Sequence, residues 1–383
     1  MLKSMKSILL MLLFSFGSSA LLPGQTVVQV DAGRGDVPVH IPSSYDPSVA
    51  TGLLMVLHGY TFSGAGMEAY FNLAPLTEEH GFIYTYPDGT IDSLGFRFWN
   101  ATSACCDMDS SGIDDVGYLL GLLDLVASQY NVDPLRVHIV GHSNGGFMAY
   151  RLICEESERF ASIVSFAGAT FNDPADCNAT SPCHTLQIHG TLDPIINYSG
   201  GFINDTYPSA TQTCTQWAVQ NGCLPDPVSG SNINLDGGIP FSETTVQRWE
   251  AGCDDGGSAE LWSILLGGHL PIPSGQMADL IFQYLLDHPK PAPSTIDQFI
   301  RGDSNADQSI DISDAIGTLD YLFGNGAIGC RESANCNSDA SLDISDVVYL
   351  LGFMFANGPQ PGSPFPICGP QPISLDCLSP TCP

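Results

Sequence analysis

The feature that most constrains this chain is the ten-residue run at positions 137–146, which reads Val-His-Ile-Val-Gly-His-Ser-Asn-Gly-Gly. Its first four residues predict a buried strand, and residues 147–156 predict a helix directly after the Gly-x-Ser-x-Gly motif. This order is typical of a nucleophile elbow, a strained turn that presents Ser143 above a sheet. Gly141 and Gly145 fit that turn because a side chain at either position would crowd it.

Apolar, strand-like runs alternate with amphipathic helical segments through residues 21–288. The expected strands lie at residues 52–57, 82–86, 137–140, 163–166, 186–189 and 261–265. Residues 114–130 predict a helix that carries its leucines on one face. Such alternation predicts an α/β fold, in which a doubly wound, mostly parallel sheet is covered by helices on both faces.

Three side chains with catalytic potential follow three of these strands: Ser143, Asp193 and His269. In an open α/β sheet, active groups gather at the carboxyl ends of the strands. The chain order of serine, acid and histidine is that of an α/β-hydrolase. We therefore expect Ser143 to attack an ester carbonyl, His269 to take its proton, and Asp193 to orient His269.

The acid of this triad has rivals elsewhere in the chain. They are the loop aspartates Asp173, Asp236, Asp254 and Asp255. Asp193 is favoured because it alone follows a buried strand at the right point in the chain order.

An oxyanion hole needs two backbone N–H groups beside the nucleophile. One is expected from Asn144, directly after Ser143. The other is expected from the loop after His58-Gly59, at Tyr60, with Thr61 as the alternative.

Further motifs accompany the elbow. They are LHG at 57–59, YPDG at 86–89, WNA at 99–101, CC at 105–106, DDVG at 114–117, VDPLRV at 132–137, AYRL at 149–152, IHGTLDP at 188–194 and GGH at 267–269. In these motifs the chain resembles the poly(3-hydroxybutyrate) depolymerase and feruloyl esterase group of secreted α/β-hydrolases, over nearly all of residues 50–288. The resemblance implies the same triad, and it implies that Trp99 and Asn100 border the acyl or sugar subsite. The chain departs from the group at residues 270–273, where Leu-Pro-Ile-Pro replaces the usual Trp-Pro step.

The N-terminus predicts export. Two lysines, Lys3 and Lys6, precede an apolar stretch at residues 8–16, and small residues at 18–20 offer a cleavage site. Residues 1–20 are therefore expected to be a signal peptide, with a retained N-terminal anchor as the alternative.

The 13 cysteines fit a secreted protein, because most thiols pair in an oxidising compartment. The odd total leaves at least one cysteine free or bound to another chain. Spacing does not determine connectivity; we favour Cys154 with Cys177, and Cys223 with Cys253.

The formal net charge is −30, from 41 acidic and 11 basic residues. Such a surface repels phosphate backbones and anionic lipids, so nucleic acid and membrane surfaces are not expected as partners. No segment after the N-terminus is long and apolar enough to predict a membrane span.

A proline-rich stretch begins at residue 289, with Pro-Lys-Pro-Ala-Pro-Ser at 289–294, and predicts a stiff linker at 289–299. Beyond it, residues 303–314 and 335–346 repeat in register. Oxygen-bearing side chains fall at loop positions 1, 3, 5, 9 and 12 of both copies, which is the spacing of an EF-hand calcium loop. The expected Ca²⁺ ligands are Asp303, Asn305, Asp307, Ser309, Asp311 and Asp314 in the first copy, and Asn335, Asn337, Asp339, Ser341, Asp343 and Asp346 in the second, with the two serines acting through their backbone carbonyls.

Each loop leads into an apolar helix, at residues 315–323 and 347–355. This duplication resembles a type I dockerin, a calcium-stabilised module that docks enzymes onto cohesin domains. The resemblance implies a small all-α calcium-loop module over residues 300–358 and a cohesin-like partner, contacted through Ile312-Ser313 and Ile344-Ser345. Residues 359–383 predict an irregular tail tied by disulfides.

These features predict a secreted or cell-surface serine carboxylic ester hydrolase with no cofactor for catalysis. Through the resemblance, its substrates are expected to be feruloyl, acetyl or hydroxyalkanoate esters of a polysaccharide or polyester, cleaved through an acyl-enzyme. The alternative is a non-catalytic polymer-binding or surface-assembly protein that uses the calcium-bound module. The complete set of triad residues favours the enzyme.

Overall fold

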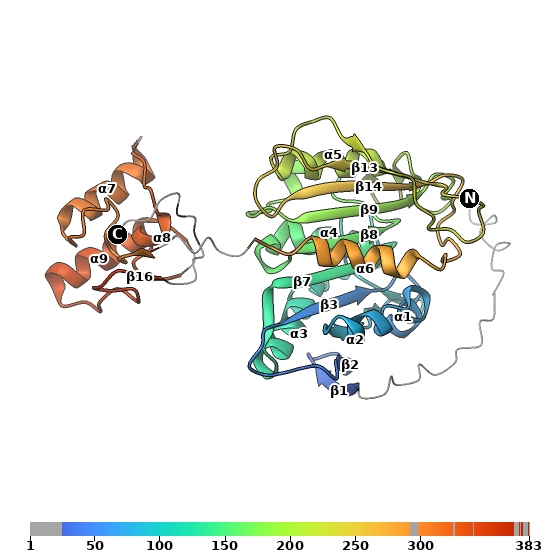
Figure 1. Ribbon diagram of the computed structural model, residues 1–383, viewed down its shortest axis with the longest axis horizontal. Helices are drawn as coiled ribbons and strands as arrows, with labels where there is room; N and C mark the ends of the chain where they lie inside the picture. The colour runs from blue at the N-terminus through green and yellow to red at the C-terminus, as the bar shows by residue number, and fades with distance from the viewer. Residues whose placement is uncertain are drawn as a thin grey trace. The chain divides into compact units, whose positions relative to one another are not determined.

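The computed structural model describes residues 25–291, 298–324, 326–339, 341–370, 375, 377 and 382. The chain divides into two compact units, one ending at Lys290 and the other beginning at Pro291 (Figure 1). This division falls within the stretch expected to be a linker. The expected signal peptide, residues 1–20, lies outside the described residues, as do residues 292–297 of the linker.

The first unit is built on a ten-stranded sheet with the order β1-β2-β4-β3-β7-β8-β9-β14-β13-β12. Strands β4, β3, β7, β8, β9 and β14 run parallel, and the strands at both edges are antiparallel. The prediction of an α/β fold with a mostly parallel sheet is confirmed. The strands of this sheet are β1 Thr26–Asp31, β2 Asp36–Ile41, β3 Thr51–Leu57, β4 Ile83–Thr85, β7 Val132–His142, β8 Ser162–Phe166, β9 His184–Gly190, β12 Val228–Ser229, β13 Thr244–Trp249 and β14 Ser258–Ile264.

Helices cover both faces of this sheet. They are α1 Gly64–Phe71, α2 Ala74–Glu79, α3 Asp115–Gln129, α4 Asn144–Glu156, α5 Ala210–Gln220 and α6 Met277–Asp287. Two short antiparallel pairs lie outside the main sheet, β5 Thr90–Ile91 with β6 Arg97–Phe98, and β10 Gly201–Phe202 with β11 Thr206–Tyr207.

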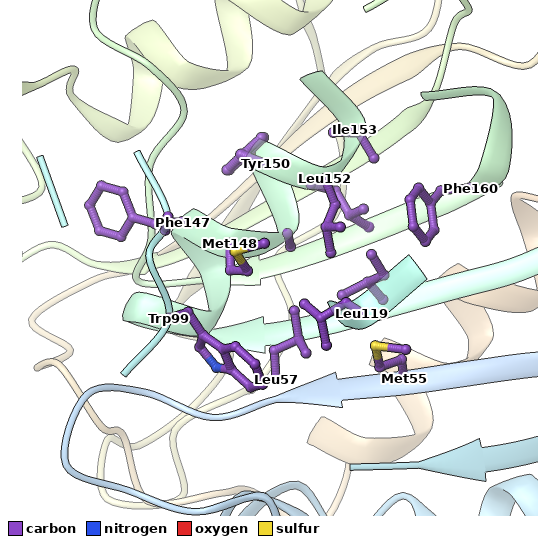
Figure 2. Packing of buried hydrophobic residues seen from close by; sticks show 14 of the residues in the cluster. Met55, Leu57, Trp99, Leu119, Phe147, Met148, Tyr150, Leu152, Ile153 and Phe160 are labelled. Carbon is purple, nitrogen blue, oxygen red and sulfur yellow. The ribbon is translucent and has the colours of Figure 1, made fainter. Parts of the chain in front are cut away.

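The side-chain alternation of β3 shows how the two faces are divided. Leu53, Met55 and Leu57 pack in one buried cluster with residues of α3, α4 and α5, part of which Figure 2 shows. Leu54 and Val56 point the other way, into a cluster with residues of α1 and α6. Burying a leucine or valine side chain contributes about 1.5–3 kcal/mol. The apolar faces therefore hold the strand ends in place, and with them the loops that carry the predicted catalytic residues.

The second unit is small and mostly helical, with α7 Ile312–Phe323, α8 Arg331–Ala334 and α9 Ile344–Ala356. Helices α7 and α9 share a small apolar core that includes Ala315, Val347 and Leu350. Two short strands lie outside the expected module of residues 300–358: β15 Gln298–Phe299 pairs antiparallel with β16 Gly369–Pro370. Residues on both sides of the helical repeat thus form a two-stranded pair that sequence periodicity did not predict.

Five disulfides connect ten of the cysteines. They are Cys105–Cys106, Cys154–Cys177, Cys223–Cys253, Cys330–Cys377 and Cys368–Cys382. Both predicted pairs, Cys154–Cys177 and Cys223–Cys253, are among them. Cys183, Cys214 and Cys336 are free and buried. Over the part of the chain that the structure describes, no helix combines the length and hydrophobicity needed to cross a membrane.

Candidate active site

Ser143 lies at the junction of β7 and α4, with φ 53° and ψ −119°. A non-glycine residue is rarely found at such a positive φ, and holding it there costs about 1–3 kcal/mol. The two flanking glycines are required by space: a Cβ on Gly141 would lie 2.1 Å from the carbonyl oxygen of Gly145, and one on Gly145 would lie 2.2 Å from that of Leu57. The strained strand-turn-helix geometry is that of a nucleophile elbow.

Asp193 and His269 meet although 76 residues separate them. The Asp193 Oδ2 atom lies 2.7 Å from His269 Nδ1, and Oδ1 accepts hydrogen bonds from the backbone N–H groups of Ile195 and Ile196 at 2.8 and 2.9 Å. Burial alone would raise the pKa of Asp193, but hydrogen bonds from His189 and His269 outweigh it and hold that pKa below its ordinary value. The carboxylate is therefore ionised and faces the imidazole, as an orienting acid requires.

The rival aspartates do not take this place. Within the described residues, His269 pairs with none of Asp173, Asp236, Asp254 and Asp255. Asp173 and Asp236 instead accept hydrogen bonds from the N–H groups of their own turns, at Ala175 and Gly238.

His142 connects the loop of His269 to the elbow. Burial is the largest of the effects that lower the pKa of His142 to about 3, so its ring is neutral. Its Nε2–H donates to the His269 carbonyl oxygen at 2.9 Å, and the two ring centroids are 4.9 Å apart. His269 is thereby held beside the residue that precedes Ser143. Because Asp193 occupies Nδ1 of His269, Nε2 is the nitrogen that can accept a proton.

Within the described residues, two backbone N–H groups in and beside the elbow have no acceptor. Over the described part of the chain, the amides of Tyr60 and Asn144 donate no hydrogen bond, whereas the alternative, Thr61, donates to the Arg97 carbonyl at 2.9 Å. The loop that carries Tyr60 packs close to the nucleophile, since a Cβ on Gly59 would lie 3.2 Å from Ser143 Cβ. Tyr60 and Asn144 therefore have the free donors that an oxyanion hole requires.

Trp99 and Asn100 have structural partners. Trp99 is fully buried within the apolar cluster of Figure 2, and its indole N–H donates to the His58 carbonyl at 3.1 Å. A side chain with no exposed surface cannot border a subsite, so the expectation for Trp99 is corrected. Asn100 is partly buried, and its side-chain amide donates to the Ile113 carbonyl at 2.8 Å.

The side chain of Asn144 has a role that sequence reasoning missed. Its Oδ1 accepts from the Trp99 N–H at 2.7 Å, and its Nδ2 donates to the Trp99 carbonyl at 2.9 Å. This two-way pairing fixes the first residue of α4 against the loop at residue 99. No local pattern reveals it, because the partners are 45 residues apart.

The first and last predicted ligands of each calcium loop in the second unit are buried. Asp303, Asp314, Asn335 and Asp346 are fully buried, and burial raises the pKa of the three aspartates among them. The other predicted side-chain ligands accept hydrogen bonds from the backbone N–H two residues further on; they are Asn305, Asp307, Asp311, Asn337, Asp339 and Asp343. Within the described residues, no group of three or more His, Cys, Asp or Glu side chains is placed so that it could hold a metal ion.

Comparison with known proteins agrees with this geometry. Residues 109–225 match the family described as Phospholipase/Carboxylesterase. A putative esterase, NocK, of Nocardia uniformis subsp. tsuyamanensis is 31% identical over 148 residues, which are 39% of this chain and 42% of that protein. Feruloyl esterase B of Piromyces equi is 27% identical over 226 residues, covering 55% of this chain and 41% of the relative. The bifunctional acetylxylan esterase/xylanase XynS20E of Neocallimastix patriciarum is 28% identical over 167 residues, covering 44% and 22%.

The chain thus spans about two-fifths or less of the length of these curated relatives. Among solved structures, an acetyl xylan esterase from Aspergillus awamori superposes with a TM-score of 0.50 at 18% identity, covering 68% of this chain and 99% of that one. Similarity at this level of identity shows the fold alone. Together with the sheet order and the family match, it establishes that the first unit has the α/β-hydrolase fold.

Proposed function

We propose that this protein is a serine carboxylesterase that works through an acyl-enzyme on Ser143. The observation that carries the proposal is the 2.7 Å hydrogen bond between Asp193 and His269 in a molecule that also holds a serine at a strained elbow. Similarity to esterases over residues 109–225 supports the same reaction class.

The proposed reaction follows from the roles of these groups. Ser143 Oγ attacks the ester carbonyl carbon while His269 Nε2 takes the hydroxyl proton. The negative charge that develops on the carbonyl oxygen is stabilised by the N–H groups of Tyr60 and Asn144. The intermediate then expels the alcohol, which takes the proton from His269. A water molecule repeats the sequence on the acyl-enzyme, and releases the acid and the free serine.

We propose that the alcohol part of the substrate is a neutral polysaccharide that bears feruloyl or acetyl groups. A cleft of about 460 Å³ lies next to the loop of the catalytic acid, because Thr191, two residues before Asp193, lines it. None of its lining residues is charged, although the chain has 41 acidic residues, and hydroxyl and amide side chains predominate: Thr191, Tyr198, Ser229, Asn232, Thr245, Gln247 and Ser263. Neutral donors and acceptors suit a sugar chain, and feruloyl or acetylxylan esterases are among the similar proteins.

Covalent labelling combined with a substrate panel tests this proposal. A fluorophosphonate should label Ser143, as mapped by peptide mass spectrometry, and feruloylated or acetylated xylan should be hydrolysed faster than a hydroxybutyrate polyester. A preference for the polyester would refute the polysaccharide assignment while retaining the esterase. Adsorption to polymer without labelling or turnover would instead favour the non-catalytic binding protein.

We propose an extracellular location for the protein. Five disulfides support it, because such bonds persist in oxidising compartments. The acidic chain composition also suits a protein that remains dispersed outside the cell.

We propose that the second unit binds Ca²⁺ through its two repeated loops. The donor chemistry fits a hard cation, because carboxylates and amides alternate along each loop. In the first loop, Asp303 accepts hydrogen bonds from the N–H groups of Asp307 and Gln308, which folds the loop around the buried carboxylate. The same unit exposes Ile312 and Ile344 at the starts of α7 and α9, which supports a protein docking role for these positions.

Calcium is expected to stabilise the second unit of the intact protein. Because an ion that binds only the folded state adds RT ln(1 + [L]/Kd), adding Ca²⁺ at about 100 times its Kd should stabilise that unit by roughly 2.7 kcal/mol. Differential scanning calorimetry of the full chain in EGTA and in millimolar Ca²⁺ measures the shift. Asp314→Ala should reduce it, and Asp124→Ala, on the surface of the first unit, should not. An identical unfolding trace with and without the ion would contradict the metal proposal.

A further inference from the structure

Three buried polar side chains, His189, Gln187 and Tyr150, form a hydrogen-bonded row that leads away from the carboxylate of Asp193. His189, on β9, is 1% exposed, and its Nε2 lies 2.8 Å from the Ile196 carbonyl oxygen and 3.3 Å from Asp193 Oδ2. On the other side of the ring, Nδ1 lies 3.2 Å from the Nε2 atom of Gln187. Residues 187 and 189 project from the same face of the strand, because side chains alternate along it.

The hydrogen bonds of Gln187 determine which atom of its amide faces the histidine. Gln187 Nε2 lies 2.8 Å from the Gly168 carbonyl oxygen, which can only accept. Gln187 Oε1 accepts from the Tyr150 hydroxyl at 3.1 Å. A flipped amide would place two acceptors against each other at Gly168. Gln187 therefore presents an N–H donor to His189 Nδ1.

This donor fixes the tautomer of His189. Since Nδ1 must accept, the ring hydrogen of the neutral imidazole is on Nε2. From there it donates to the Ile196 carbonyl oxygen at 2.8 Å, and the same nitrogen lies 3.3 Å from Asp193 Oδ2. The tautomer is thus set by residues that touch neither substrate nor the reacting atoms.

We propose that His189 is a positioning residue, which holds Oδ2 of Asp193 in line with His269 Nδ1. The proposal rests on the proposed function, because it concerns the triad of that site. Oδ1 of Asp193 is anchored by two backbone N–H groups, at Ile195 and Ile196. Among the described residues, the other group that hydrogen-bonds to Oδ2 is the N–H of His269 itself, the ring that must gain and lose a proton. His189 places a second N–H group 3.3 Å from this oxygen, and its bond to the Ile196 carbonyl fixes the ring, so the carboxylate keeps its orientation through the cycle.

Two substitutions at position 189 separate positioning from packing. In His189→Gln the terminal amide reaches about as far as Nε2 and can still donate to Asp193. In His189→Asn the amide ends near Nδ1, so the donor is lost. The loss of a hydrogen bond to a charged group of this kind corresponds to about tenfold in rate. We expect His189→Asn to lower kcat on methyl ferulate about tenfold with KM little changed, and His189→Gln to recover most of that loss.

Tyr150→Phe is the matched control. It removes a buried hydrogen bond from the same row of side chains, but the Gly168 carbonyl still fixes the orientation of the Gln187 amide. Its thermal stability should fall while its kcat stays near that of the parent. If His189→Asn does not fold, Gln187→Met tests the proposal in its place. This variant leaves Nδ1 of His189 without a donor and should lower kcat several-fold.

The rate at which a fluorophosphonate labels Ser143 is measured on the same variants, because it reports activation of the serine without any ester substrate. Slow labelling of His189→Asn with recovery in His189→Gln supports the proposal. Parent-like rates in His189→Asn, or an equal loss in Tyr150→Phe, would overturn it. If the parent is labelled but hydrolyses no ester, the proposed substrate fails while the labelling rates still decide the role of His189. A parent that is not labelled would refute both.

Discussion

Ser143→Ala is expected to lower kcat on any ester that the protein accepts by about 10⁵–10⁶-fold, since loss of the nucleophile removes the covalent route entirely. The residual rate should come from the free N–H groups of Tyr60 and Asn144 and from substrate binding, which need no serine hydroxyl. KM should change little. Steady-state kinetics on p-nitrophenyl acetate and methyl ferulate measure both constants.

The same position offers an independent check on the elbow geometry. Ser143 adopts φ 53°, which alanine tolerates no better than serine but glycine adopts freely. We expect Ser143→Gly to be as inactive as Ser143→Ala but more thermally stable than it. Ser128→Ala, on the exposed side of α3, is the control for both. Parent-like turnover in either position-143 variant would rule out Ser143 as the nucleophile.

The parallel strands of the sheet, and the positions of the candidate catalytic residues directly after them, could be predicted because both depend on local sequence patterns. Apolar runs mark the parallel strands, and a functional residue directly after such a run must lie at the same edge of the sheet as its counterparts. That logic favours Asp193, which follows the buried strand β9 at a point in the chain between the serine and the histidine. The antiparallel edges gave weaker signals: β12 has only two residues, too few to show a period.

The supporting contacts could not be predicted, because they join residues that are distant in sequence. Asn144 pairs with the backbone of Trp99, and Gln187 donates to the carbonyl of Gly168. No spacing rule relates the residues of either pair. Family resemblance placed Trp99 at the substrate because it lies in a conspicuous motif. Its burial shows that the motif is held together by packing and by the bond from its indole N–H to His58.

Asp193→Asn is expected to lower kcat by about 10⁴-fold with little loss of stability, because an isosteric amide reverses the donor pattern that the histidine needs. The structure dictates how this amide would lie. The N–H groups of Ile195 and Ile196 require an acceptor at the Oδ1 position, so the amide oxygen must go there and the NH₂ group must take the Oδ2 position. That group would then face Nδ1 of His269, which would have to accept, leaving the hydrogen on Nε2.

A His269 ring with its hydrogen on Nε2 cannot take the proton of Ser143, so the loss comes from the wrong tautomer and not from a missing charge alone. The same NH₂ group would also oppose the Nε2–H of His189 at the present 3.3 Å separation, which disfavours the arrangement further. Asp173→Asn is the matched control, since Asp173 caps its own turn through a bond that asparagine can also accept. If Asp193→Asn keeps kcat within tenfold of the parent, His269 is oriented by some other group and the assignment of the acid is wrong.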